Sequence, residues 1–134
     1  MAYGTDLAGA AQRHFDAAEH LNHPAPRGKR DVAGYLYGIA AECALKQIMQ
    51  RSNMRPVAYG DDPFYMHFPE IKTALLDTAR GRHMSRLHRH ANNGSLMSEW
   101  DIRMRYAGGP EVLQKPIDRW RDQARELVRE MHEL

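Results

Sequence analysis

The stretch AGYLYGIAAECALKQIMQ (residues 33–50) is apolar on almost every side, and yet it carries Glu42 and Lys46 in its middle. Apolar residues that cover more than one helical face are typical of a central helix with several neighbours. Gly34 and Gly38 weaken such a helix but let another helix approach its backbone closely. The stretch therefore predicts the buried central helix of a helical protein.

Glu42 and Lys46 stand four residues apart with the acid first, an order that stabilises a helix by about 0.2–0.5 kcal/mol. On a solvated edge of the helix the pair would be ordinary polar surface. Inside the fold both groups would have to be bonded, because an unpaired buried carboxylate costs several kcal/mol. The sequence leaves both alternatives open.

The rest of the chain also reads as helix interrupted by breakers. We expect a first helix capped by Thr5 or Asp6 and ending at about Leu21, and the central helix from an Asp31 N-cap to about Arg51. A third helix is expected to begin at Pro69, and a short one to pass through Met84, Leu87 and Ala91. The last helix is expected to begin at Pro116 and to carry an apolar stripe of Ile117, Trp120, Ala124, Leu127, Val128 and Met131. Residues 23–30, 53–67 and 107–110 hold prolines and glycines and are expected to be breaks. No stretch alternates like a strand. The sequence predicts an all-α fold, an antiparallel up-and-down bundle of four or five helices, in one domain over residues 1–134.

Composition narrows the class of protein. Apolar residues make up 43% and charged residues 27% of the 134 residues, close to ordinary globular usage. No long uncharged apolar run and no leader are evident, so we expect no membrane span. The single cysteine, Cys43, cannot form an intramolecular disulfide, and a cytoplasmic location is expected.

Positive charge is concentrated in one segment although the net charge is only +2. No acidic residue lies between Asp77 and Glu99, and the segment holds Arg80, Arg82, His83, Arg86, His88, Arg89 and His90. Such a segment is either a solvated face or a contact for phosphate or RNA. The histidines lack the spacing of a metal site, and no phosphate-binding loop is present, so we expect neither metal nor cofactor.

Three stretches together carry a family resemblance: RDVAGYLYGIAAECALK from Arg30, HFPEI from His67 and WDIRMRYA from Trp100. Over residues 12–131 the chain resembles the HEPN domain (higher eukaryotes and prokaryotes nucleotide-binding). The resemblance implies a homodimeric all-α bundle of a bacterial toxin–antitoxin or antiphage system, with a nucleotidyltransferase-type protein as a partner. It also implies either an RNA- or nucleotide-binding module or a metal-independent ribonuclease, with Glu42 and Lys46 in a polar seam.

Catalytic members of the family carry an arginine, four to six intervening residues, and a histidine. The cation stabilises charge on phosphorus, and imidazole moves the proton of a 2′-hydroxyl. Arg82 with His88 is the best of three pairs with this spacing, and composition alone predicts roughly three. In the family's late Arg-Tyr region, Arg103 and Arg105 are followed by no histidine in range.

Two functions from different classes follow, a ribonuclease and a binding module. A subunit that only contacts other proteins is a third. A ribonuclease would use the displaced pair Arg82 and His88. A binding module would contact RNA or a nucleotide through Arg103, Arg105, Tyr106, Glu42, Lys46, Arg86 and Arg89. Arg103 or Arg105 either pairs with Glu42 or holds phosphate, and Tyr106 is expected to be exposed.

Overall fold

The computed structural model describes residues 4–52, 63–78 and 85–134, and within them the chain is helical, with no strand. The elements are α1 (Leu7–Leu21), α2 (Arg30–Arg51), the 3-10 turn η1 (Pro63–Tyr65), α3 (Glu70–Thr78), α4 (Ser85–Ala91), the 3-10 helix η3 (Ile102–Tyr106), α5 (Gly109–Leu113) and α6 (Ile117–His132). The predicted all-α bundle is confirmed. The described residues hold six α-helices because three short ones, α3, α4 and α5, accompany the three long ones.

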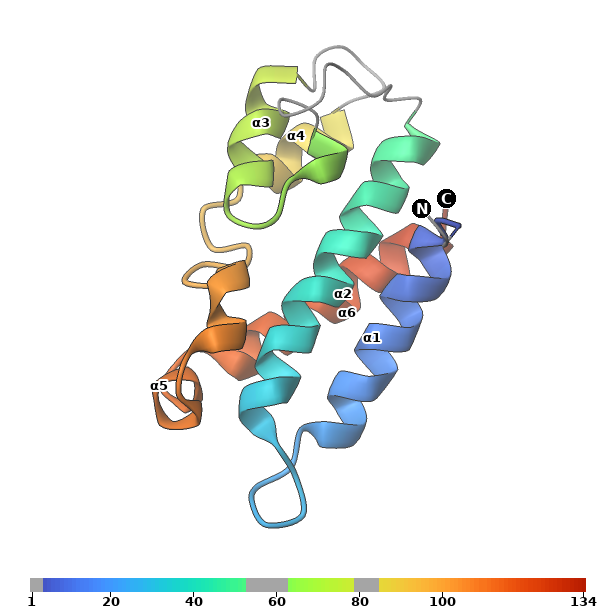
Figure 1. Ribbon diagram of the computed structural model, residues 1–134. Helices are drawn as coiled ribbons and strands as arrows, with labels where there is room; N and C mark the ends of the chain where they lie inside the picture. The colour runs from blue at the N-terminus through green and yellow to red at the C-terminus, as the bar shows by residue number, and fades with distance from the viewer. Residues whose placement is uncertain (1–3, 53–62, 79–84) are drawn as a thin grey trace.

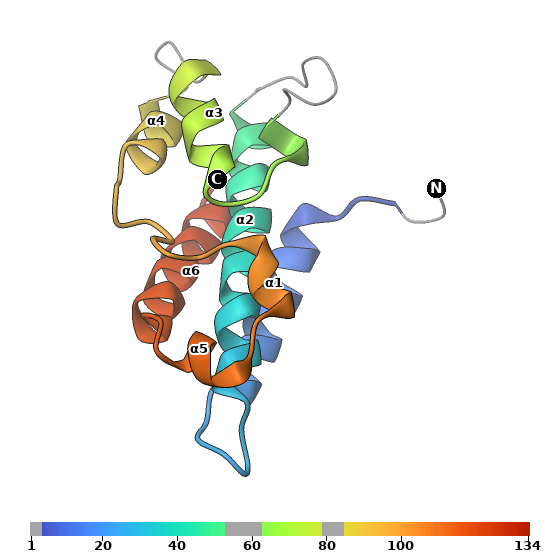
Figure 2. The ribbon, with the colours of Figure 1, turned by 60° about the vertical axis from the view of Figure 1, so that its left-hand side comes forward.

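The three long helices form the body of the molecule, with α2 at its centre (Figure 1). α1 and α2 make an antiparallel hairpin, and α6 packs against α2 and also runs opposite to α1 (Figures 1 and 2). α3 and α4 lie together beside the C-terminal half of α2, whereas η3 and α5 lie beside its N-terminal half (Figure 2). One side of α2 therefore faces short segments rather than a long helix.

The sequence pattern explains why α2 is central. Twelve of its 22 residues are buried, and they are spread around the helix. By contrast, α6 is buried along one stripe only, at Ile117, Trp120, Ala124, Leu127, Val128 and Met131, together with Glu130. The predicted apolar stripe of the last helix is confirmed, and burial of these side chains against α2 supplies much of the driving force for folding.

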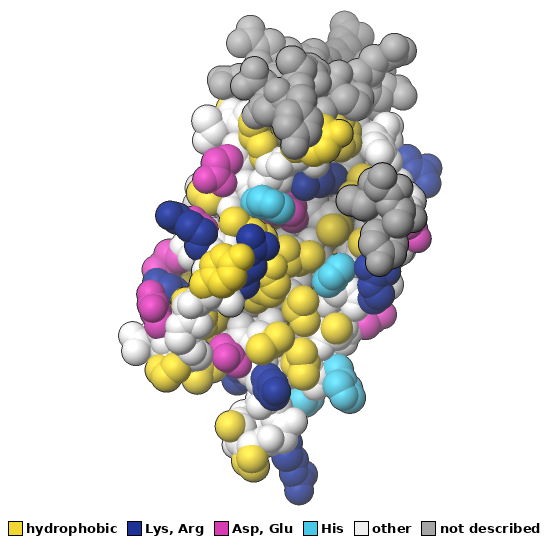
Figure 3. Space-filling model, in the orientation of Figure 1, with side chains coloured by type: hydrophobic (Ala, Val, Ile, Leu, Met, Phe, Trp, Pro, Cys, Tyr) yellow, Lys and Arg dark blue, Asp and Glu magenta, His cyan; other side chains and the backbone are white. Residues whose placement is uncertain are grey.

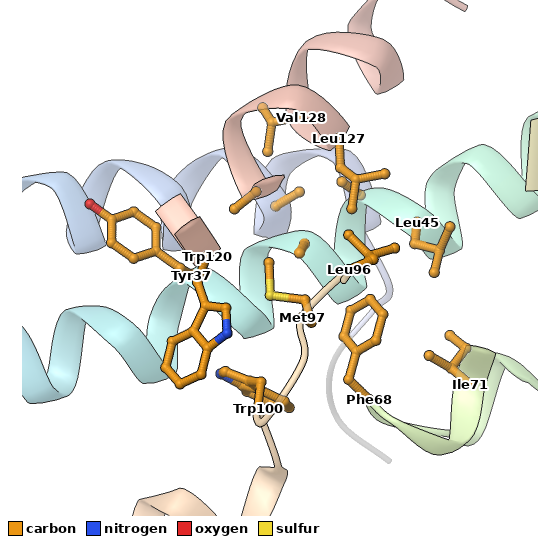
Figure 4. Packing of buried hydrophobic residues seen from close by; sticks show 14 of the residues in the cluster. Tyr37, Leu45, Phe68, Ile71, Leu96, Met97, Trp100, Trp120, Leu127 and Val128 are labelled. Carbon is orange, nitrogen blue, oxygen red and sulfur yellow. The ribbon is translucent and has the colours of Figure 1, made fainter. Parts of the chain in front are cut away.

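Two glycines of α2 allow close packing, as predicted. At Gly34 a Cβ atom would lie 3.1 Å from Ile117 and 3.3 Å from Trp120, so α6 packs on the backbone there. At Gly38 a Cβ atom would lie 1.9 Å from the indole of Trp100. Trp100 belongs to the non-helical segment before η3, so at Gly38 the close neighbour is an indole ring and not a helix (Figure 4).

Trp100 organises the core on this side of α2. Its indole N–H donates to the carbonyl oxygen of Gly34 at 3.2 Å. Its ring stacks on Tyr35 at 5.9 Å and meets Phe68 edge-on at 6.4 Å between centroids. The row Tyr35, Trp100 and Phe68 therefore joins the start of α2, the segment before η3 and the segment before α3. Figure 4 shows Trp100 and Phe68.

Helix ends were predicted with mixed success. Asp6 caps α1 as expected, since its carboxylate accepts a hydrogen bond from the Gly9 N–H at 2.9 Å. The prediction of Asp31 as N-cap was wrong: Lys29 is the N-cap and Asp31 lies in the first turn. The Lys29 N–H bonds to the carbonyl of Leu21 at 2.8 Å, so closure of the hairpin onto α1 places the start of α2.

A second boundary also differs from the prediction. Residues 107–110 were expected to break the chain, but Gly108 caps α5, and Gly109 and Pro110 lie in its first turn. Proline is tolerated in a first turn because its missing N–H would have no partner there. Of the loop expected over residues 53–67, residues 53–62 lie outside the described part of the chain, and η1 follows them.

Candidate functional site

Glu42 and Lys46 lie inside the fold, with exposed fractions of 4% and 8%. Glu42 Oε2 accepts a hydrogen bond from His67 Nδ1 at 2.9 Å, and Oε1 accepts one from the Phe68 N–H at 3.2 Å. The Lys46 ammonium lies 3.5 Å from Oε2. Of the two alternatives for the charged pair, the buried and bonded one is therefore correct.

The contact with Glu42 fixes the orientation of the His67 imidazole. Because a carboxylate accepts, Nδ1 carries the hydrogen, and Nε2 is the ring nitrogen left for other partners. The His67 side chain is 45% exposed, and no described residue bonds Nε2. A buried carboxylate that orients a half-exposed imidazole is an arrangement suited to proton transfer.

Sequence reasoning did not identify His67 as a partner of Glu42. In the sequence, His67 stands out only as the start of the HFPEI stretch that carries the family resemblance. The two residues are 25 positions apart, on α2 and on the segment before α3, and no local pattern links them. Within the described residues, no group of three or more metal-ligating side chains is found.

Arg103, Arg105 and Tyr106 lie on η3. Arg103 is bound at both ends of its guanidinium to Asp101, at 2.9 and 2.8 Å, and this lowers the pKa of the Asp101 carboxyl to about 2. Arg105 lies over the Tyr106 ring, 4.9 Å from its centroid, and the neighbouring Tyr35 hydroxyl raises the pKa of Arg105. Neither arginine is the partner of Glu42.

Tyr106 is 79% exposed, which confirms the prediction that it faces solvent. Arg105 is exposed as well. A guanidinium has five N–H donors, so contact with Tyr35 leaves several of them available to a ligand. The Arg105–Tyr106 pair is thus a cation and an aromatic ring presented together at the surface.

Part of the basic segment forms ion pairs inside the fold. Arg86, Arg89 and His90 of α4 approach the carboxylate of Glu130 on α6 at 3.1, 3.6 and 2.7 Å. Glu130 is only 7% exposed, so these contacts hold α4 on α6. The side chains of Arg86 and Arg89 remain 41% and 70% exposed.

The contacts of α4 with Glu130 do not test the catalytic pair favoured by spacing, Arg82 with His88. Arg82 lies outside the described residues, as do Arg80 and His83. His88 is exposed on α4. It is not one of the α4 side chains that approach Glu130, which are Arg86, Arg89 and His90. The pairing of Arg82 with His88 stays a prediction.

A separate polar cluster joins the three long helices. Glu19 of α1 accepts hydrogen bonds from the Tyr37 hydroxyl at 2.7 Å and from Arg121 at 2.5 and 2.9 Å. The Arg121 guanidinium lowers the pKa of Glu19, and burial together with Glu19 raises the pKa of Tyr37. Because every member is paired within the bundle, this cluster stabilises the fold.

The residues of interest share one face of α2. Asp31, Tyr35, Glu42 and Lys46 are separated by four, seven and four residues, a spacing that places them on one side of the helix. The Arg105 contact at Tyr35 and the His67 contact at Glu42 are therefore about two helical turns, or roughly 10 Å, apart. Trp100, stacked on Tyr35 and touching Phe68, lies between them.

An apolar stripe runs along α2 beside this site. Val32 is exposed, and Leu36, Ile39 and Cys43 are only partly buried. Figure 3 shows apolar side chains gathered along the middle of this face, with histidine and charged side chains beside them. The homodimer expected from the family resemblance stays a prediction. The mass of the native particle in solution is the measurement that tests the dimer.

Comparison with known proteins adds no assignment. No family model matches the chain, and no curated protein or solved structure is significantly similar to it. None of the helices in the described residues is long and apolar enough to cross a membrane. The function must therefore be argued from the site itself.

Proposed function

We propose that this chain is an RNA- or nucleotide-binding helical module, of the kind that the HEPN resemblance suggests in toxin–antitoxin or antiphage systems. The observation that carries the proposal is the exposed pair Arg105 and Tyr106, set beside Tyr35 on the same side of α2 as the Glu42–His67 contact. A guanidinium attracts phosphate, and an exposed ring stacks on bases of any sequence.

The surroundings of the pair favour a ligand over a structural role. Arg105 has no acidic partner among the described residues, whereas Arg103, Arg121 and Arg129 each bind a carboxylate. Tyr106 buries little of its ring. Side chains that contribute little to packing and carry unsatisfied donors are the ones that a ligand can use without disturbing the fold.

Arg105→Ala is expected to leave the melting temperature within about 2 °C of the wild type, because the side chain lies outside the core. It is expected to weaken binding of single-stranded RNA about tenfold and to reduce the salt slope of log Kd by about one. Fluorescence anisotropy at several salt concentrations measures both.

Arg119→Ala is the matched control, because Arg119 is an exposed arginine on α6 and its loss removes the same charge. It is expected to weaken binding much less than Arg105→Ala. Equal losses in the two variants would show that only net charge matters, and unchanged binding in Arg105→Ala would reject the site.

The second candidate function is a metal-independent ribonuclease, and the Glu42–His67 contact favours it. In this reaction Nε2 of His67 takes the proton of a 2′-hydroxyl, and the oxygen attacks the adjacent phosphorus. The bond to the 5′-oxygen breaks, a 2′,3′-cyclic phosphate forms, and the leaving oxygen takes a proton. Arg105, with its free donors, is the described arginine on this side of α2 that would stabilise the negative charge.

His67→Gln separates this candidate from the pair favoured by spacing. In the presence of EDTA the wild type would convert RNA to fragments ending in cyclic phosphate, and His67→Gln would slow this conversion at least 100-fold through loss of the base. His88→Gln would leave the rate unchanged. A reversed pattern would favour Arg82 with His88, and intact RNA with the wild type would leave binding as the function.

A further inference from the structure

An open cleft lies between the first turns of α2 and the segment formed by η3 and α5. It has a volume of about 220 Å³ and is lined by Asp31, Val32, Tyr35, Met104, Arg105, Ala107 and Val112. Val32, Met104 and Val112 give it apolar walls, and its polar groups are one carboxylate, one phenol hydroxyl and one guanidinium. Apolar walls with a few polar groups are typical of a small-molecule site.

The carboxylate of Asp31 has no partner within the described part of the chain. Among the described residues no hydrogen bond or ion pair to it is found, although Asp118, in the first turn of α6, is bound by Arg30. Asp31 Oδ2 lies against the backbone of Gly109, where a Cβ atom would come within 2.9 Å of it. A carboxylate without a partner at the wall of a cleft offers only acceptors to a ligand.

Donors lie one helical turn away. Tyr35 follows Asp31 by four residues on the same face of α2, and Tyr35 and Arg105 both line the cleft. Stacking on Trp100 holds the Tyr35 ring in place. The cleft thus offers both the acceptor oxygens of the Asp31 carboxylate and the N–H donors of the Arg105 guanidinium.

Guanine matches this arrangement better than the other bases. One edge of guanine carries the N1–H and N2 amino donors, and the adjacent O6 and N7 are acceptors that arginine binds in a bidentate manner. Adenine would turn the lone pair of N1 toward the carboxylate, and the two acceptors would repel each other. Pyrimidines lack the second acceptor edge for the guanidinium.

Resting on the proposed function, we infer that this cleft binds guanine, with Asp31 accepting from N1–H and N2 and with Arg105 donating to O6 and N7. The apolar walls cover the faces of the base. The same chemistry is offered by a free guanine nucleotide and by an unpaired guanosine in RNA. The site therefore gives the binding surface a base preference.

The test compares GMP with AMP, and a short oligouridine holding one guanosine with the same oligomer holding one adenosine. The wild type is expected to bind a guanine ligand at least tenfold more tightly than its adenine counterpart. A preference seen with the RNA pair alone identifies guanosine in RNA as the source, and one seen with GMP alone identifies the free nucleotide.

Asp31→Asn is expected to remove this preference, because it should weaken the binding of the guanine ligand at least tenfold and the binding of the adenine ligand less than twofold. Asp122→Asn, which changes an exposed acid on α6, is expected to change neither. The comparison of bases on the wild type needs no variant, so it remains decisive even if Asp31→Asn destabilises α2.

Equal affinity for the two bases, or an equal loss for both in Asp31→Asn, would overturn the guanine site. RNA binding that depends on Arg105 but shows no base preference would overturn this inference and leave the proposed function standing. No binding of any of the four ligands would remove both.

Discussion

Gly38→Ala is expected to lower the free energy of unfolding by about 2–3 kcal/mol. The added methyl group would lie 1.9 Å from the Trp100 indole, which is fully buried and held by Tyr35 and Phe68. Overpacking of this kind costs about 1–3 kcal/mol or more, and it exceeds the gain of up to about 1 kcal/mol from replacing glycine in a helix. Thermal and urea denaturation measure the difference.

Two other glycines are controls for Gly38. Gly34→Ala brings the same gain in helix propensity with a milder contact, 3.1 Å to Ile117, so it is expected to be destabilised less. Gly94→Ala meets nothing within 4 Å and is expected to be close to neutral. A Gly38→Ala protein as stable as the wild type would contradict the packing of Trp100 on α2.

Glu42→Ala is expected to have the largest effect of the substitutions considered, a loss of about 3–5 kcal/mol. Lys46 would remain in the interior without its carboxylate, and the Phe68 N–H and His67 Nδ1 would lose their acceptor. Removal of one member of a buried ion pair costs this much because the other charge is left uncompensated. Chemical denaturation followed by circular dichroism gives the value.

Two further variants separate the charge from the hydrogen bonds. Glu42→Gln keeps an oxygen that accepts from Phe68 and is expected to cost less than Glu42→Ala. Adding Lys46→Met to Glu42→Ala removes the lone charge and is expected to restore about 1–2 kcal/mol. A loss of under 1 kcal/mol in the free energy of unfolding of Glu42→Ala would show that the Glu42 carboxylate does not hold Lys46, His67 and Phe68 together. It would then not be what orients His67.

The helices were predictable because their signals are local. The apolar stripe of α6, the Asp6 cap and the prolines at Pro69 and Pro116 each lie within a few residues of the element that they mark. The same reasoning failed at Asp31, where a contact with α1 places the start of α2, and at Gly109, where Gly108 caps α5. Periodicity reports which face of a helix is apolar, but it does not report which segment covers that face.

The candidate site was predictable only in part. Glu42 and Lys46 form a pair that needs partners if it is buried, and Tyr106 was expected to be exposed. The partner of Glu42 proved to be His67 and not an arginine, and Arg103 is bound by Asp101. Arg86 and Arg89, proposed for RNA, also contact Glu130.

The sequence by itself determined that this protein is a helical bundle built around α2, because helical periodicity and the spacing of Gly34 and Gly38 are properties of consecutive residues. Only the tertiary structure decided which polar groups meet. The Glu42–His67 contact spans 25 residues, and the cleft brings Asp31 together with Arg105. Contacts between residues far apart in the chain depend on how the helices pack, and many packings satisfy the same local pattern.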